Sequence, residues 1–280
     1  MKRAATTRAA TRASTRSQSS EYDARIRGAP AFAELDVTLK PGQAIMSNGG
    51  SLAYMREGVE RGKLEGHGIF GMVKRALGGQ SFFLVSYKGL DTPTAASRRV
   101  TFSSPVPGDI LRLDMTPGAR VVVSRESYMA GSPSVNVSGK LNWRGMFEIG
   151  QDEGLVLPEL KCDGVPGSAW LGAYGAFQRH DLQAGNTLLV DNGLFLACVR
   201  PAGSTGKLYS VVKLGKSFIS SLLGGEGLGM KFEGPAIVYT QSHNLNDLAG
   251  MIAARLPSSD NSPGIKIDFG GGKKSSSKKH

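Results

Sequence analysis

Cysteine and histidine are scarce in this chain of 280 residues, which has two of the former and four of the latter. The cysteines, Cys162 and Cys198, form no CxxC pair and have no histidine pair near them. This pattern excludes a disulfide framework and a cysteine–histidine zinc site, so we expect two buried free thiols. No apolar run reaches the ~18 residues of a membrane-spanning helix. We therefore expect no transmembrane segment, and no cofactor or metal site.

Acidic residues are absent from both ends of the chain. Residues 1–20 contain five cations and residues 270–280 contain four, with no acid in either segment. The nine are Lys2, Arg3, Arg8, Arg12, Arg16, Lys273, Lys274, Lys278 and Lys279. They account for most of the net charge of +11, because the remaining 25 bases are offset by 23 acids. The basic character belongs to the ends and says little about what the body binds.

Glycine is abundant, with 38 residues, which is about twice the ~7% of an average protein. Apolar residues alternate with polar ones at 35–40, 111–116 and 135–137. This period of two predicts half-buried antiparallel strands with one dry and one wet face. Helix is expected in two places, at 245–256 with Pro257 as its stop, and as a short helix at 69–77.

The stretch GGEGLGMKFEG, residues 224–234, resembles a phosphate-binding loop. A P-loop needs a lysine directly after its second glycine and then a serine or threonine. Here Met230 precedes Lys231, and Phe232 stands where the hydroxyl is needed. We therefore interpret the stretch as a structural turn whose glycines let a strand begin.

Internal repeats support that interpretation. Segments 39–55, 115–131 and 182–198 each have a turn glycine, a β run, a small turn and an apolar pair that ends in alanine. Segments 77–85, 149–157 and 223–232 share a second, glycine-containing pattern that opens a strand. The period near 70 predicts an all-β body at 29–256 in three units, about 29–105, 106–180 and 181–256. A disordered basic arm at 1–28 and a flexible basic tail at 257–280 would flank it.

Several motifs resemble one known family. VPGD-x-L-x-L, WLGAYGAF, LLVDNG-x-FLA and the most specific, LGGEGLGMKFEGPAIVYTQS, resemble the altered-inheritance-of-mitochondria protein 24 family, also described as tryptophan-RNA-binding-attenuator-like. The resemblance spans roughly residues 30–255 and implies three tandem β units with pseudo-threefold symmetry and no established catalytic residues. Fungal members are mitochondrial inner-membrane-associated proteins that support cristae organisation and respiratory-complex assembly, so it implies an organelle protein that is soluble or peripheral. The attenuator label concerns the fold, which alone does not carry function.

Three sets of residues have the types that chemistry needs. Ser242, His243 and Asp247 are the types of a hydrolase triad, but adjacent residues of a strand point to opposite faces and no G-x-S-x-G elbow occurs. His180–Asp181 has no second ligand pair at metal spacing, which favours a surface turn. Asp152–Glu153 lies between glycines and is expected to be a solvated turn. His67 and His280, in a glycine-rich stretch and in the tail, complete the histidines. We expect no catalytic residue.

The basic arm leaves three interpretations open: a cleaved transit segment, an arm that binds nucleic acid or an anionic surface, and a passive solubilising tail. Its Arg, Ser, Thr and Ala bias is typical of a transit peptide, but it lacks a bulky apolar face. Two basic ends on a nearly neutral body favour docking on phosphate-rich partners. The sequence thus predicts a non-enzymatic scaffold that contacts proteins or itself, with the nine terminal cations on a polyanion. The alternative is a nucleic-acid-binding protein, which the 20 aromatic residues support poorly because several fall in apparent core runs.

Overall fold

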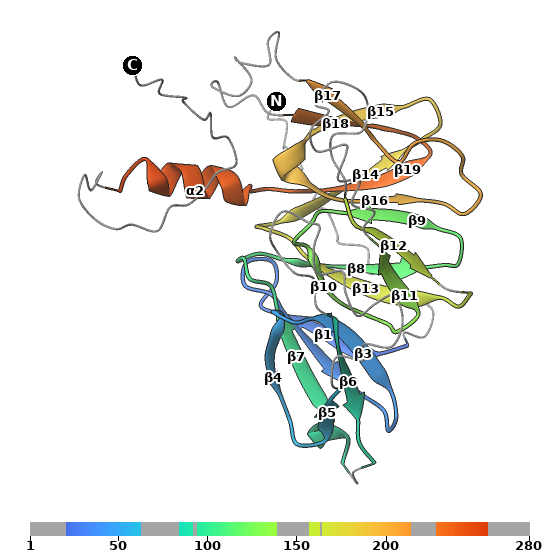
Figure 1. Cartoon of the computed structure of the whole chain (residues 1–280), viewed down its shortest axis with the longest axis vertical. Helices are drawn as coiled ribbons and strands as arrows, with labels where there is room; N and C mark the ends of the chain where they lie inside the picture. Colours follow the sequence, from blue (N-terminus) through green and yellow to red (C-terminus); the bar gives the residue numbers. More distant parts are fainter. Residues whose placement is uncertain are drawn as a thin grey trace, which may run out of the picture. The chain divides into compact units, whose positions relative to one another are not determined.

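The structure is a computed structural model, and it describes residues 21–62, 84–91, 94–138, 157–162, 164–213 and 228–256. The chain divides into two compact units, Met1–Leu245 and Asn246–His280. All described strands lie in the first unit, so the fold is mainly β, as the alternating pattern predicts (Figure 1). The described helix longer than one turn is α2 (Leu245–Ala253), which begins where the sequence predicts.

Alternation and glycine turns divide the body into short strands. The chain begins with β1 (Asp23–Arg27), β2 (Glu34–Thr38), β3 (Ala44–Asn48), β4 (Leu52–Met55), β5 (Val59–Arg61), β6 (Leu84–Gly89), the 3₁₀ turn η2 (Ala95–Ser97) and β7 (Arg99–Ser103). It continues with β8 (Ile110–Met115), β9 (Arg120–Val123), β10 (Tyr128–Gly131), β11 (Val135–Ser138), β12 (Glu159–Cys162) and β13 (Gly167–Gly172). The last group is β14 (Phe177–Leu182), β15 (Thr187–Asp191), η3 (Asn192–Leu194), β16 (Phe195–Arg200), β17 (Ser210–Lys213), β18 (Leu228–Glu233) and β19 (Ala236–Gln241).

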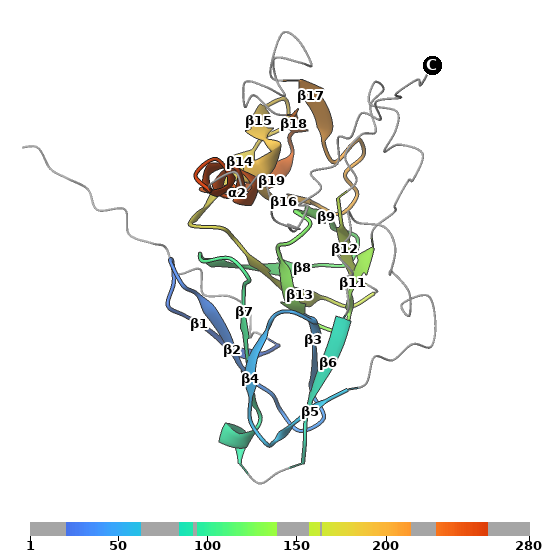
Figure 2. The same cartoon turned by 60° about the vertical axis from the view of Figure 1, so that its left-hand side comes forward.

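The four sheets repeat one connectivity. Their strand orders are β1-β2-β7-β4, β5-β6-β3-β10-β13-β8, β11-β12-β9-β16-β19-β14 and β15-β18-β17. From β2 onward, each group of six strands has its first, sixth and third strands in one sheet and its fourth, fifth and second in another. Figure 2 shows the two sheets of the first group: strands β2, β7 and β4 lie on one side and face β3, β6 and β5 on the other. Tandem β units are therefore present, whereas pseudo-threefold symmetry and the boundaries of the units stay predictions.

Neighbouring groups are joined by strand pairing. β3 pairs with β10, and β9 pairs with β16, both antiparallel. Three of these joining strands, β9, β10 and β16, are largely buried on both faces, because alternate side chains enter different cores, whereas β3 is fully buried on one face only. In β9, for example, Val121 and Val123 pack in one core while Val122 packs in the next. The described part of the body thus has three apolar cores separated by shared sheets.

The repeated turns are real turns. Gly42, Gly118 and Gly185 precede β3, β9 and β15, and all three have positive φ, at 71°, 79° and 84°. An L side chain rarely adopts this conformation, which explains why glycine recurs there. The second repeated pattern leads into β6, β12 and β18, the strands with the same place in each group.

Two expectations need correction. Asp36 was expected on the wet face of its strand, but it is buried at 4% exposure. It accepts a hydrogen bond from Thr101 Oγ1 (2.9 Å) and forms ion pairs with Arg27 and Arg99. These partner side chains cover the Asp36 carboxylate on the polar face of the strand. Furthermore, β1 lies inside the range 1–28 assigned to a disordered arm, because its backbone pairs with β2 over five residues. The helix expected at 69–77 lies outside the described residues.

Candidate functional site

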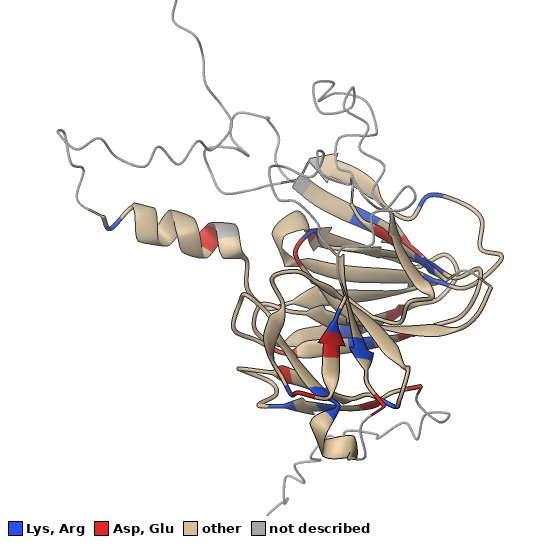
Figure 3. Ribbon diagram, turned by 60° about the horizontal axis from the view of Figure 1, so that its bottom comes forward, with Lys and Arg blue, Asp and Glu red and all other residues tan. Residues whose placement is uncertain are grey.

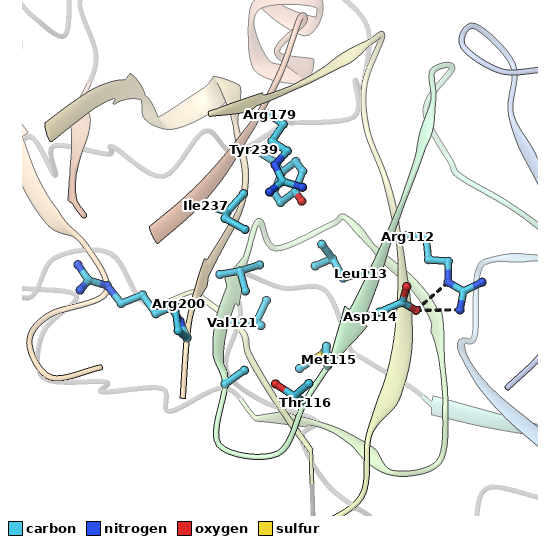
Figure 4. A pocket seen from close by; sticks show the side chains of 13 residues that line it. Arg112, Leu113, Asp114, Met115, Thr116, Val121, Arg179, Arg200, Ile237 and Tyr239 are labelled. Atoms are coloured by element: carbon cyan, nitrogen blue, oxygen red, sulfur yellow. Dashed lines mark hydrogen bonds and ion pairs between the residues drawn. The ribbon is translucent and has the colours of Figure 1, made fainter. Parts of the chain in front are cut away.

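A hollow lies between strands of the second and third groups (Figure 4). It has a volume of about 620 Å³. We call it the central hollow, and the residues that define it here are Leu113, Met115, Val121, Ile237, Arg179 and Tyr239. They come from β8, β9, β14 and β19.

Strand alternation makes the floor of the central hollow apolar. Leu113 and Met115 of β8 pack in the second core together with Val121 of β9, and Ile237 of β19 packs against it. In Figure 4, Leu113, Val121 and Ile237 surround the same space. Arg112 and Asp114 of β8, which also line the hollow, form an ion pair with each other (2.8 Å).

The rim of the central hollow carries one cation beside an aromatic ring. Arg179 binds the Asp181 carboxylate at 2.6 Å, and this hydrogen bond lowers the pKa of Asp181 and raises that of Arg179. Tyr239 lies beside Arg179, and burial raises the pKa of its phenol. Because the guanidinium is already paired, the rim offers little net charge to a ligand.

Arg200 contributes no charge to the hollow. It precedes Pro201 at the edge of the space, but its guanidinium extends away in Figure 4. Its Nη2 donates to the Glu233 backbone carbonyl at 2.7 Å, on β18. No serine, cysteine or histidine is among the residues that line the hollow.

The structure brings two of the three predicted triad types together. Ser242 and His243 were expected on opposite faces of a strand, but β19 ends at Gln241 and the two follow it. Ser242 Oγ lies 2.8 Å from His243 Nδ1 and accepts a hydrogen bond from the Ala176 backbone N–H at 3.1 Å. The expectation of opposite faces was wrong because a turn follows the strand there. Asp247 lies in α2, which belongs to the second compact unit.

His180–Asp181 lies in β14 and not in a turn, which corrects the sequence-based expectation. His180 Nε2 is within hydrogen-bond distance of Thr240 Oγ1 (3.1 Å) on the neighbouring strand β19. Asp181 is paired with Arg179, as described above. Among the described residues, no three histidine, cysteine or acidic side chains converge as metal ligands would.

The glycine-rich stretch is a strand where the structure describes it. Leu228–Glu233 forms β18, which pairs with β15 on one side and β17 on the other. Lys231 Nζ binds Glu233 Oε1 at 3.0 Å within the same strand. Gly234 follows, where an added Cβ would meet the Gln183 carbonyl oxygen at 2.0 Å. This close backbone approach, rather than a phosphate, accounts for that glycine.

Both cysteines are free and buried, as predicted. Burial raises the pKa of the Cys198 thiol to about 12. Asp152–Glu153, His67, His280 and the nine terminal cations lie outside the described residues, so the structure neither places nor tests them.

Sequence reasoning missed the central hollow altogether. Its lining comes from four strands spread between positions 113 and 239. Each side chain is an ordinary strand residue in its local context, so no local signal marks it. Only the pairing of strands across groups brings the lining together.

Comparisons with known proteins agree with this architecture. An uncharacterized protein of Streptococcus pyogenes serotype M6 is 24% identical over 237 residues, which is 82% of this chain and 89% of that protein. A crystal structure of a protein from Streptococcus pyogenes has a TM-score of 0.63 at 21% identity, and the match covers 84% of this chain and 100% of that one. It shows that the fold is shared.

No helix among the described residues is long and apolar enough to cross a membrane. The model of one family, described as mitochondrial biogenesis AIM24, matches residues 24–243. This range covers the three groups of strands and most of the chain. The chain therefore belongs to the AIM24 family of mitochondrial biogenesis proteins.

Proposed function

We propose that this protein is a non-enzymatic scaffold or assembly protein associated with mitochondria. Its body contacts proteins, and its basic ends dock on a polyanion. The observation that carries the proposal is the separation of the chain into a nearly neutral body and two purely basic ends. Figure 3 shows cations and acids interspersed on the body. Arg112–Asp114, Arg179–Asp181 and Lys231–Glu233 are three examples of local pairing.

The surface of the body supports contacts with proteins. Large apolar side chains are exposed in several of its strands and turns: Ile26, Phe32, Tyr54, Met55, Leu90, Val165 and Leu189. Single exposed apolar residues are normal in monomers. Four of these, however, lie on edge strands of the described sheets: Ile26 on β1, Tyr54 and Met55 on β4, and Leu189 on β15. Exposed edge strands can pair with a strand of another chain.

A nucleic-acid-binding body is supported less well. Binding of single strands commonly uses exposed aromatic platforms beside cations. The one cation over an indole ring in the described residues is Arg112 above Trp170, at 5.6 Å, and Trp170 is only 1% exposed. Bases could not stack on that ring.

The test is a salt titration of binding to duplex DNA, RNA and vesicles that contain phosphatidylserine. The full chain is compared with a variant in which the nine terminal cations are replaced by Gln. We expect the full chain to bind with steep salt dependence, because each neutralised DNA phosphate contributes a slope of about −0.9 in log affinity against log salt. The variant should lose this binding.

A matched control neutralises Arg112, Arg120 and Arg179 on the body and keeps the ends, and it should bind as the wild type does. If the nine-residue variant keeps tight, sequence-selective RNA binding, the scaffold proposal is wrong and the nucleic-acid alternative replaces it. Preference for vesicles or for nucleic acid in the wild type would identify which polyanion the ends dock on.

A further inference from the structure

One rule of strand pairing joins the groups of the body. Ala130 of β10 pairs with Ser47 of β3, and Gly131 pairs with Met46. One group later, Ala197 of β16 pairs with Val123 of β9, and Cys198 pairs with Val122. In both cases the third strand of a group pairs with the second strand of the group before it.

The register of this pairing is the same at both junctions. Each third strand has a bulge that begins ten residues after its turn glycine, at Leu52, Tyr128 and Phe195. The residue that follows each bulge is therefore equivalent: Tyr54, Ala130 and Ala197. Its partner is the fifth residue after the turn glycine of the preceding group, which is Ser47 in one junction and Val123 in the other.

The first and last groups each leave one strand without the partner that this pairing rule would give it. β4 is the third strand of the first group and lies at the edge of its sheet, and β15 is the second strand of the last group and lies at the edge of its own. Within the described part of the chain, neither has a partner on its outer side. Figures 1 and 2 show them at opposite ends of the first compact unit. The two edges therefore cannot pair with each other without rearrangement of that unit.

Both edges are also apolar where an edge is usually protected. Proteins commonly place lysine, arginine or proline on an open edge strand to prevent pairing. Of the other edge strands in the described sheets, β1, β5, β8, β14 and β17 contain charged residues and β11 does not, whereas β4 has none and β15 has only Asp191. Met55 and Leu189 are 41% and 54% exposed.

We infer that β15 of one copy of this protein pairs with β4 of a second copy, antiparallel and in the register of the internal junctions. The rule places Tyr54 opposite Val190, which belongs to the third core, and Met55 opposite Leu189. The unpaired backbone N–H and C=O groups of the two edges hydrogen-bond to each other. The apolar side chains of both strands are removed from water at the rim of the third core. The inference deepens the proposed role of the body by naming a partner, and it does not depend on what the ends bind.

The contact joins different surfaces of the two copies, so each added copy again exposes one β4 and one β15. Such head-to-tail contacts form rings when the rotation closes and open filaments when it does not. We therefore expect assemblies that grow beyond dimers as the concentration rises. Tyr54 occupies the position that Ala130 and Ala197 hold in the internal junctions. The larger tyrosine ring has room beside Val190, because no described strand lies beyond β15.

The test cross-links two differently tagged full-length chains, one with Met55→Cys and the other with Leu189→Cys, by a short bismaleimide at high salt. High salt screens any association through the basic ends. We expect cross-linked products that carry both tags when the two variants are mixed, and no product from either variant alone or from the wild type, whose two cysteines are buried. Equal cross-linking of each variant with itself would mean symmetric pairing and would overturn the inference.

Charge on the edge gives an independent measurement. Light scattering of the wild type should show mass that increases with concentration, and Leu189→Lys or Met55→Lys should remove this increase. Val165→Lys introduces the same charge at an exposed turn residue and should not remove it. Circular dichroism checks that each variant is folded. A wild type that stays monomeric at all concentrations would also overturn the inference, whether or not its ends bind a polyanion.

Discussion

The ring of Tyr22 packs edge to face against the indole of Trp170, with centroids 5.6 Å apart. Tyr22 precedes β1, whereas Trp170 lies in β13 of the second group. Both are fully buried in the first core, and the Tyr22 hydroxyl donates to the Ala44 carbonyl at 2.6 Å. The start of the described chain is thus part of the structure that holds the first two groups together.

We predict that Tyr22→Ala destabilises the fold by about 3–5 kcal/mol, the usual cost of removing a buried ring. Tyr22→Phe keeps the ring contact with Trp170 and should cost only about 1 kcal/mol, for the lost hydrogen bond. Urea unfolding followed by circular dichroism measures both. Phe32→Ala, at a ring that is 75% exposed, is the control and should change stability by less than about 0.5 kcal/mol. If Tyr22→Ala behaves like this control, the segment before β1 does not stabilise the core.

Asp36→Ala should destabilise the fold by about 2–3 kcal/mol, because it removes the partner of the buried Thr101 hydroxyl and of two arginines. This expected loss of stability is smaller than for breaking a fully buried ion pair, because Arg27 and Arg99 remain partly in contact with water. Asp181→Ala breaks an ion pair whose side chains are both more than half exposed, so the loss should stay below about 1 kcal/mol. Equal effects of the two substitutions on the urea midpoint would contradict the assigned role of Asp36.

Lys231→Ala should leave the melting temperature and any response to ATP or GTP unchanged, because Lys231 makes only an exposed pair with Glu233. Gly234→Val should instead lower the melting temperature substantially, since its Cβ would overlap the Gln183 carbonyl. Thermal unfolding with and without nucleotide measures both variants. Nucleotide stabilisation that Lys231→Ala abolishes would restore the phosphate-loop interpretation.

Much of the local architecture could be predicted from sequence. Alternation located β2, β8 and β11, and the repeat located the turns at Gly42, Gly118 and Gly185, because period and turn chemistry are local properties. Burial of Asp36 could not be predicted, since it depends on Thr101 and Arg99, which are more than 60 positions away.

Which strands pair with each other could also not be predicted from local sequence patterns. β3 pairs with β10, some 80 residues later, and the repeat alone does not state whether the groups are separate or share sheets. The same limit applies to the central hollow, whose lining exists only because the second and third groups share a sheet. For Ser242 and His243, the error was one of boundary: the strand ends at Gln241, immediately before them.

Alkaline pH should destabilise the fold through Cys198. This thiol is fully buried, and burial raises its pKa to about 12, whereas an unfolded thiol has a pKa of about 8.5. Above the latter value the unfolded chain releases a proton that the folded chain retains. The unfolded state then binds fewer protons, so stability falls as pH rises from about 8.5 toward the folded pKa.

The measurement is the urea midpoint of the wild type and of Cys198→Ala from pH 7 to pH 10. Cys198→Ala has a constant cost from the lost side chain at all pH values, so only the change with pH is diagnostic. At 1.36 kcal/mol per pH unit, the advantage of the wild type over the variant should shrink by about 2 kcal/mol between pH 8.5 and pH 10. The buried phenols of Tyr22 and Tyr128 also have raised pKa values, but they are present in both proteins and cancel in the comparison. Parallel curves would show that Cys198 reaches water in the native state, and a thiol reagent would then label it without unfolding.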